Sequence, residues 1–193
     1  NDHRLNAQWF KGVIAGMEIY SDLRTAEEIA LDAQRACKEF ISDSNLLAAF
    51  DFTQKEPLNL LDKSSNGNDV LFNGDIDYSG LEGATFNSDD RYYTVNKLNQ
   101  EAPNTFEAEV FLPKSYTARA GIIYGNWGSG ASINFEVNPN GKVRFYHTDT
   151  NGIDQNLIFE NSNIRTGDWA HVAVVHDKAA NATLCYINGE LVG

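Results

Sequence analysis

From residue 46 onward, apolar and polar residues alternate in short runs, as in strands that bury one face. The run SINFEVN (residues 132–138) places Ile133, Phe135 and Val137 on one side and polar residues on the other. Similar runs are separated by Gly, Asn, Asp and Pro at close intervals. The pattern predicts antiparallel β-structure for most of the chain.

Two asparagine–glycine pairs predict tight hairpins between such strands. The first lies in NPNGK (residues 138–142), which leads into the strand KVRFYH, and the second opens NGELVG (residues 188–193). Both pairs supply the positive φ that a two-residue hairpin needs. Only a few residues of the second returning strand are present, so the sheet is left unfinished.

Between residues 21 and 45 the period becomes helical. Thr25 and Glu28 have the spacing of a capping box, and we predict a helix of about 16 residues, roughly 24 Å long. If this helix joined strands at 13–20 and 46–52 within one sheet, the two strands would be parallel. An antiparallel sandwich does not accommodate that arrangement, so the pattern favours a linker helix.

The composition excludes several classes of function. Among 193 residues there are 27 acidic and 15 basic ones, and no Lys/Arg cluster that would bind a phosphate backbone. The longest apolar runs fall far short of the roughly 20 residues of a membrane helix. We therefore predict no nucleic-acid partner and no membrane insertion. Cys37 and Cys185 lack metal-like spacing, which favours two unpaired thiols over a disulfide.

Three stretches together resemble a known family. They are WFKGVIAGMEIYSDLRTAEEI (residues 9–29), LLAAFDF with LLDKSSNGNDVLFNGD (within 46–75), and TGDWAHVAVVHDKAANATLCYINGELVG (166–193). They are similar to the closing strand and helix, the opening strand with its Asp/Asn-rich loop, and the Gly-x-Trp-x-His-Val segment of laminin-G-like, concanavalin-A-like jelly-roll domains. Such domains occur in tandem in secreted bacterial proteins.

The resemblance implies an all-β fold, a two-sheet antiparallel jelly-roll sandwich with one N-terminal linker helix. Because the closing motif comes first, we divide the chain into closing strands of a preceding repeat (1–22), a linker helix (23–43) and a jelly roll without its own closing strands (44–193). In the alternative, a permuted or exchanged arrangement, residues 1–20 fill the vacancy in this sandwich, since like repeats have like strands.

Catalysis is not predicted. Laminarinase-type glycosidases of this fold carry a Glu-x-Asp-x-x-Glu strand, which the sequence lacks. Glu107 and Glu109 project to one face, but a solvated or polar strand face is favoured over a glycosidase pair. His171 and His176 are five residues apart on a predicted strand and so point to opposite faces, which prevents them from sharing a metal.

Calcium is a candidate cofactor at the loop DKSSNGND, because hard cations take several carboxylate and carbonyl oxygens. The loop's candidate ligands are Asp62, Asn66, Asn68 and Asp69. The alternative is an Asx-rich turn that satisfies its own amides. The resemblance implies a structural calcium near this loop, helped by an acidic residue of the closing strand. Ala15 and Gly16 occupy the matching positions here, so part of that ligand set is missing.

Glycan binding requires aromatic rings for the apolar sugar faces and polar side chains for the hydroxyls. The candidates are Tyr124, Asn126, Trp127, Tyr146, His147 and Asp149. Trp127 follows Asn126 in a glycine-rich loop and has little core to fill, although it could equally cover one end of the sandwich. Trp169, just before a strongly apolar strand, is predicted to be core.

The resemblance thus implies a non-catalytic carbohydrate-binding module of a larger secreted or cell-surface bacterial protein, with a glycan as partner. The alternative is a structural spacer or protein-interaction module without a glycan site. In either case another repeat or chain could supply or receive strands.

Overall fold

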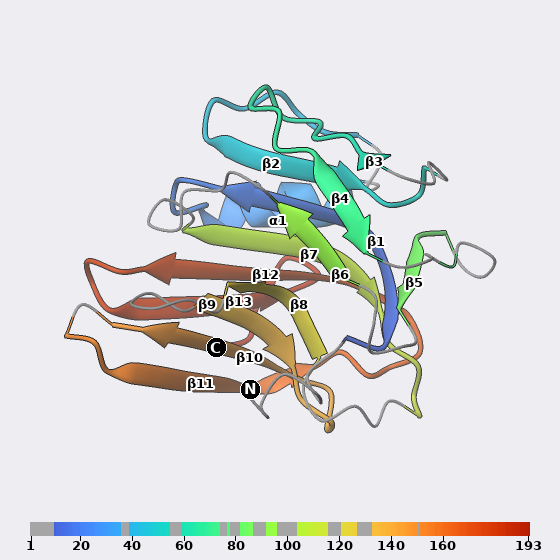
Figure 1. Ribbon diagram of the computed structural model, residues 1–193. Coiled ribbons are helices and arrows are strands. Elements are labelled where there is room, and N and C mark those ends of the chain that lie inside the picture. Colours follow the sequence, from blue (N-terminus) through green and yellow to red (C-terminus); the bar gives the residue numbers. More distant parts are fainter. Residues whose placement is uncertain are drawn as a thin grey trace, which may run out of the picture.

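The computed structural model describes residues 10–35, 39–54, 59–73, 77, 82–86, 92–95, 104–115, 121–126, 133–149 and 151–193. Within these ranges the chain forms the strands β1 to β14 and the helix α1 (Figure 1). Cys37, Trp127 and the first nine residues lie outside the described ranges.

The largest sheet has seven strands in the order β14-β13-β12-β7-β1-β2, with β5 paired to β1, and all its pairings are antiparallel. Its strands are β1 (Gly12–Tyr20), β2 (Leu46–Asp51), β5 (Ala84–Phe86), β7 (Thr105–Phe111), β12 (Trp169–Asp177), β13 (Ala182–Ile187) and β14 (Glu190–Leu191).

Two smaller antiparallel sheets complete the β-structure. The four-stranded sheet has the order β11-β10-β9-β8 and the three-stranded sheet the order β3-β4-β6. Their strands are β3 (Asn59–Leu60), β4 (Val70–Asn73), β6 (Tyr92–Val95), β8 (Gly121–Asn126), β9 (Ile133–Val137), β10 (Lys142–Thr148) and β11 (Asp154–Asn163).

The main core lies between the four-stranded and seven-stranded sheets. Phe135 and Phe145 of the former pack in one cluster with Ile19, Phe106 and Val174 of the latter. This arrangement confirms the predicted all-β sandwich and the alternating burial along β10, whereas on β9 the predicted polar positions Asn134 and Glu136 are buried as well. Both predicted Asn-Gly hairpins form, and the glycine of each pair, Gly141 or Gly189, has a φ of +82°.

Helix α1 (Ala26–Gln34) packs on the other face of the seven-stranded sheet, which we call the helix face. Its buried residue Ile29 lies in a cluster with Ala173, Val175 and Tyr186. Thr25 closes the predicted capping box with Glu28: its backbone N–H donates to Oε2 at 2.8 Å, and its hydroxyl accepts from the Glu28 N–H.

The predicted length of about 16 residues is wrong, because α1 has nine. Arg35 leaves the helix with extended backbone (φ −70°, ψ 136°), and its guanidinium turns back to bond Asp32 and Glu18.

The strands at 13–20 and 46–52 do share one sheet, the case in which we expected them to be parallel, but they are antiparallel. β1 pairs with β2 in antiparallel register, and the Ser21 N–H donates to the Asn45 carbonyl at 2.8 Å. A nine-residue helix followed by irregular chain brings residue 45 back to the end of β1 rather than to its start. β1 therefore lies between β2 and β7 in this sheet. The division of the chain into repeats stays a prediction.

Candidate functional site

Two of the predicted glycan ligands point into the sandwich. Tyr124 packs on Phe106 with ring centroids 4.9 Å apart, and burial raises the pKa of its hydroxyl to about 12. His147 is buried with its ring centroid 4.2 Å from that of His176. The cause is strand phase: a register irregularity in β8 places Tyr124 opposite Phe135, and His147 follows the core phase of β10.

The other predicted glycan ligands are distributed differently. Asp149 belongs to the turn after β10, where its Oδ1 accepts the backbone N–H groups of Asn151 and Ile153, each at 2.9 Å. Tyr146 faces away from the core. Asn126 ends β8, and its side chain, like Trp127, lies outside the description. In the part of the chain that is described, these six residues form no single cluster.

A polar surface does exist on the four-stranded sheet, on the side turned away from the core, which we call the outer face. β9, β10 and β11 contribute their non-core positions to it, and β10 pairs with both neighbours in register. Tyr146 lies opposite Asn134 on β9 and Asn156 on β11, and the exposed Gly125 continues this row on β8.

The next row of the outer face is charged. Arg144 lies opposite Glu136, and their Nη1 and Oε2 atoms form an ion pair 3.1 Å apart. Arg144 Nε also donates to Asn156 Oδ1 at 2.7 Å, and the guanidinium carbon lies 6.0 Å from the Tyr146 ring centre. These contacts fix Arg144 between the two rows.

Two of these polar side chains are buried rather than solvated. Asn134 and Glu136 are each 1% exposed, and Asn134 Nδ2 has no hydrogen-bond partner within the described chain. Burial raises the pKa of Glu136, an effect that Arg144 opposes. A buried donor without a partner costs stability. Simple alternation assigns both residues to solvent, which is why the sequence analysis passed over them.

The predicted calcium loop is an extensively hydrogen-bonded turn. Asp62 Oδ1 accepts the backbone N–H groups of Ala49 and Ser64, each at 2.9 Å, while Oδ2 accepts the Asn68 N–H at 2.8 Å and the Ser64 hydroxyl at 2.6 Å. Asp69 Oδ1 accepts the Asp62 N–H at 3.0 Å. A carboxylate surrounded by four donors does not fit a cation ligand, because each donor presents positive charge to it.

The remaining loop side chains cover the free edge of β2. Asn66 Nδ2 donates to the carbonyls of Leu46 and Leu47 at 2.8 and 3.1 Å, and Asn68 Nδ2 donates to Leu47 at 2.7 Å. Backbone groups of an edge strand need such partners. The contacts therefore favour the Asx-rich turn among the two interpretations of this loop.

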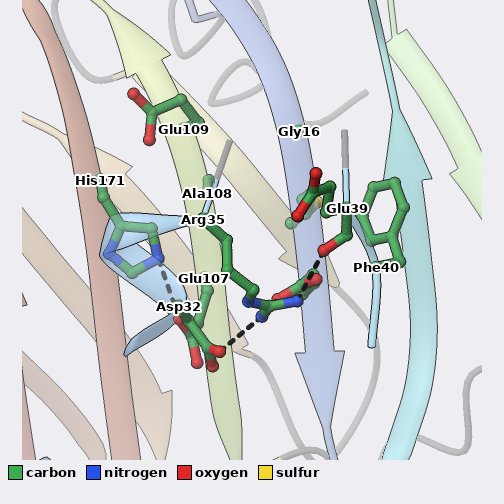
Figure 2. A pocket seen from close by; sticks show the side chains of 11 residues that line it. Gly16, Asp32, Arg35, Glu39, Phe40, Glu107, Ala108, Glu109 and His171 are labelled. Atoms are coloured by element: carbon green, nitrogen blue, oxygen red, sulfur yellow. Dashed lines mark hydrogen bonds and ion pairs between the residues drawn. The ribbon is translucent and has the colours of Figure 1, made fainter. Parts of the chain in front are cut away.

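A second group of charges lies between the helix face and α1. Carboxylate oxygens of Glu18, Asp32 and Glu107 lie within 4.8 Å of one another. Two arginines bind the central one: Arg24 contacts Asp32 Oδ2 and Arg35 contacts Asp32 Oδ1, each at 2.5 Å. Figure 2 shows Arg35 and His171 directed toward Asp32 and Glu107.

Glu107 lies on a polar strand face, as one of the two alternatives predicted, but that face is not solvated, because Glu107 is 1% exposed beneath α1. Its Oε2 lies 2.9 Å from Nε2 of His171. Burial raises the pKa of Glu107 while His171 opposes that shift. Burial lowers the pKa of His171, but the Glu107 carboxylate outweighs this and the net shift is upward.

The histidines do face opposite sides of the sheet, as predicted, since His176 lies in the core against Phe145. On the helix face, Arg24 and Arg35 pair with Asp32, and Arg35 also pairs with Glu18. The cavity beside this group of charges measures only about 30 Å³, roughly the volume of one water molecule.

Three smaller predictions concern single side chains and membrane insertion. Cys185 is a buried free thiol, and burial raises its pKa to about 12. Trp169 is partly buried and packs on Phe111 with ring centroids 5.8 Å apart. Over the described residues, α1 is far too short and polar to span a bilayer.

The comparisons with known proteins agree with this fold. A family model described as the concanavalin A-like lectin/glucanases superfamily matches residues 86–193, more than half of the chain. The chain therefore belongs to this superfamily.

Curated protein sequences gave no match. Among solved structures, the chain is similar to the binding domain of Paraclostridial Mosquitocidal Protein 1, with 13% identity and a TM-score of 0.44. That alignment covers 69% of this chain and 37% of the other. At this level of similarity, the match provides no argument about function.

Proposed function

We propose that the chain is a non-catalytic carbohydrate-binding module that holds a glycan on the outer face of its four-stranded sheet. The observation that supports this most directly is the row formed by Asn134, Tyr146 and Asn156 across three neighbouring strands. An aromatic ring flanked by amides on a flat β-surface combines the two kinds of contact that sugars need.

Each side chain has a role in this proposal. The half-buried Tyr146 provides the apolar platform, and the exposed Asn156 hydrogen-bonds hydroxyl groups at its rim. Asn134 lies in the same row but is only 1% exposed, so Tyr146 and Asn156 make the contacts with the sugar in this proposal. Asn126 and Trp127 follow Gly125 at the end of β8 and remain predicted contributors.

The proposal excludes catalysis on this surface. Glycoside hydrolysis needs two carboxyl groups about 5 to 9 Å apart around the bond to be cleaved. Glu136 is buried and paired with Arg144. Glu107 lies on a different sheet, enclosed beneath α1. We further propose, from the resemblance to modules of secreted bacterial proteins, that the parent protein acts outside the cell.

The test is affinity electrophoresis of the chain against a panel of soluble plant, fungal and bacterial polysaccharides. We expect at least one polymer to retard the wild type. Tyr146→Ala and Asn156→Ala should each weaken that binding about tenfold, the loss that corresponds to about 1.4 kcal/mol.

Asn161→Ala is the matched control for Asn156→Ala, because both asparagines are exposed on β11. It should bind like the wild type. Equal binding by all variants would move the site away from the outer face. If no polymer retards the wild type, the alternative of a spacer or protein-interaction module replaces this proposal.

A further inference from the structure

We propose that Glu136 makes the outer face selective for neutral over anionic glycans by neutralising Arg144. This inference rests on the proposed function and names the ligand class for the same surface. It begins with the charges presented along β10, whose outer positions include Lys142 and Arg144.

Each of these two cations has an anionic partner on a neighbouring strand. Arg144 pairs with Glu136 on β9 at 3.1 Å, and Lys142 pairs with Glu160 on β11. The two pairs differ in burial: the side chain of Glu136 is 2% exposed and that of Glu160 is 72% exposed. A buried partner is weakly screened by water and salt, whereas an exposed one is screened strongly.

Arg144 would otherwise be the natural partner of a sugar carboxylate, because a guanidinium binds carboxylates through two parallel hydrogen bonds. Here Nη1 is engaged by Glu136 and Nε by Asn156. An anionic sugar would have to approach the buried Glu136 carboxylate without gaining a free positive charge. The net charge of the chain, −12, adds a repulsion of the same sign.

A neutral sugar meets no such penalty. Its hydroxyl groups both donate and accept, so they can bond the exposed Asn156 amide without burying a charge. The Tyr146 ring, next to the Arg144–Glu136 pair, favours contact with the uncharged C–H faces of a sugar ring. The arrangement therefore selects against uronic-acid polymers by electrostatics and desolvation rather than by shape.

The experiment compares retardation by neutral polysaccharides (β-glucan, xylan and galactomannan) with retardation by polygalacturonate. The wild type should bind a neutral polymer and ignore polygalacturonate at low salt. Glu136→Gln leaves Arg144 without its anionic partner, so this variant should gain polygalacturonate binding by about tenfold or more. The gain should disappear at about 0.5 M salt, where screening is short-ranged.

Two variants control this result. Glu160→Gln removes the same charge from the exposed pair, and we expect little gain because Lys142 and Glu160 are already solvated. The double variant Glu136→Gln/Arg144→Gln lacks the liberated cation and should show no gain. Circular dichroism and the unfolding temperature establish that each variant is folded. If Glu136→Gln does not fold, Glu136→Asp replaces it, since the shorter side chain weakens the pair and should give a smaller gain.

Polygalacturonate binding by the wild type would overturn the inference, as would equal gains in Glu136→Gln and Glu160→Gln. These outcomes are distinct from failure of the proposed function. If no neutral polymer binds the wild type while Glu136→Gln alone gains polygalacturonate binding, charge compensation by Glu136 is supported and neutral-glycan binding is rejected.

Discussion

Glu107 on β7 and His171 on β12 place their Oε2 and Nε2 atoms 2.9 Å apart beneath helix α1. Both side chains are almost entirely buried, on the sheet face that also receives Arg24, Asp32 and Arg35. Two adjacent strands are thus linked by this contact on a polar face that is buried rather than solvated. The pair lies beneath helix α1, on the opposite side of the sheet from the sandwich core.

Removing one member of this pair should destabilise the protein strongly. Glu107→Ala leaves the His171 imidazole buried beside a void, and we expect a loss of about 3 to 5 kcal/mol in the free energy of unfolding. Urea denaturation measures this. Glu190→Ala, an exposed acidic residue on β14, is the control and should change stability by less than about 0.5 kcal/mol.

A double variant separates the pair from its surroundings. Glu107→Leu/His171→Leu removes both charges and fills the space, so it should be less destabilised than either single change to alanine. If both single changes behave like the exposed control, the two side chains contribute nothing as a pair.

Some features of the fold could be predicted from neighbouring residues in the sequence, and others could not. Local signals were sufficient for the Thr25–Glu28 capping box and the turn at Gly141, because neighbours in the chain determine both. The burial of Glu107 depends on α1, which lies about 80 residues earlier, so strand alternation could not reveal it. The inward side chain of Tyr124 depends on a register shift in β8. Such irregularities have no reliable sequence signal.

Acid should weaken the sandwich through the histidine pair in its core. His147 on β10 and His176 on β12 come from opposite sheets, with ring centroids 4.2 Å apart. Burial lowers the pKa of His147, and burial together with His147 lowers that of His176 to about 4. The unfolded chain, with a histidine pKa near 6.5, binds protons more readily than the folded one as the pH falls.

The stabilisation that comes from the two neutral histidines is therefore complete above about pH 6.5 and is lost progressively toward pH 4. Unfolding temperatures measured across this range should fall with pH. In His176→Phe, which keeps an aromatic ring and cannot be protonated, the decline should be shallower. The same slope in this variant and the wild type would assign the acid sensitivity to other groups.

The Asp62 loop should stabilise the protein through hydrogen bonds rather than through calcium. Asp62→Ala removes the acceptor of four hydrogen bonds, three of them from backbone amides. We expect a loss of about 2 to 3 kcal/mol, because bonds to a charged acceptor are among the stronger ones. Calorimetry with added calcium and with chelator should give the same unfolding temperature for the wild type. A rise of several degrees with calcium would restore the cation site.

Two glycines, one in the turn at each end of β10, test how tightly the chain packs around these turns. Gly141 and Gly152 both have positive φ, +82° and +76°. A Cβ on Gly141 would lie 2.4 Å from Asn163 Oδ1 and 3.0 Å from the Arg165 backbone nitrogen, while a Cβ on Gly152 would meet nothing within 4 Å. Gly152→Ala should therefore cost only the backbone penalty of about 1 kcal/mol.

Gly141→Ala incurs that penalty and must also displace the chain at Asn163 and Arg165, so we expect a loss of more than about 2 kcal/mol. Both variants carry the same backbone cost of an alanine at positive φ. The difference between their free energies of unfolding therefore measures the steric cost of the extra Cβ at Gly141. Since β10 contributes Arg144 and Tyr146 to the outer face, Gly141→Ala should also weaken glycan binding, whereas Gly152→Ala should leave it nearer to wild type. Equal stability of the two variants would show that the segment around Asn163 yields easily and does not hold β10 in place.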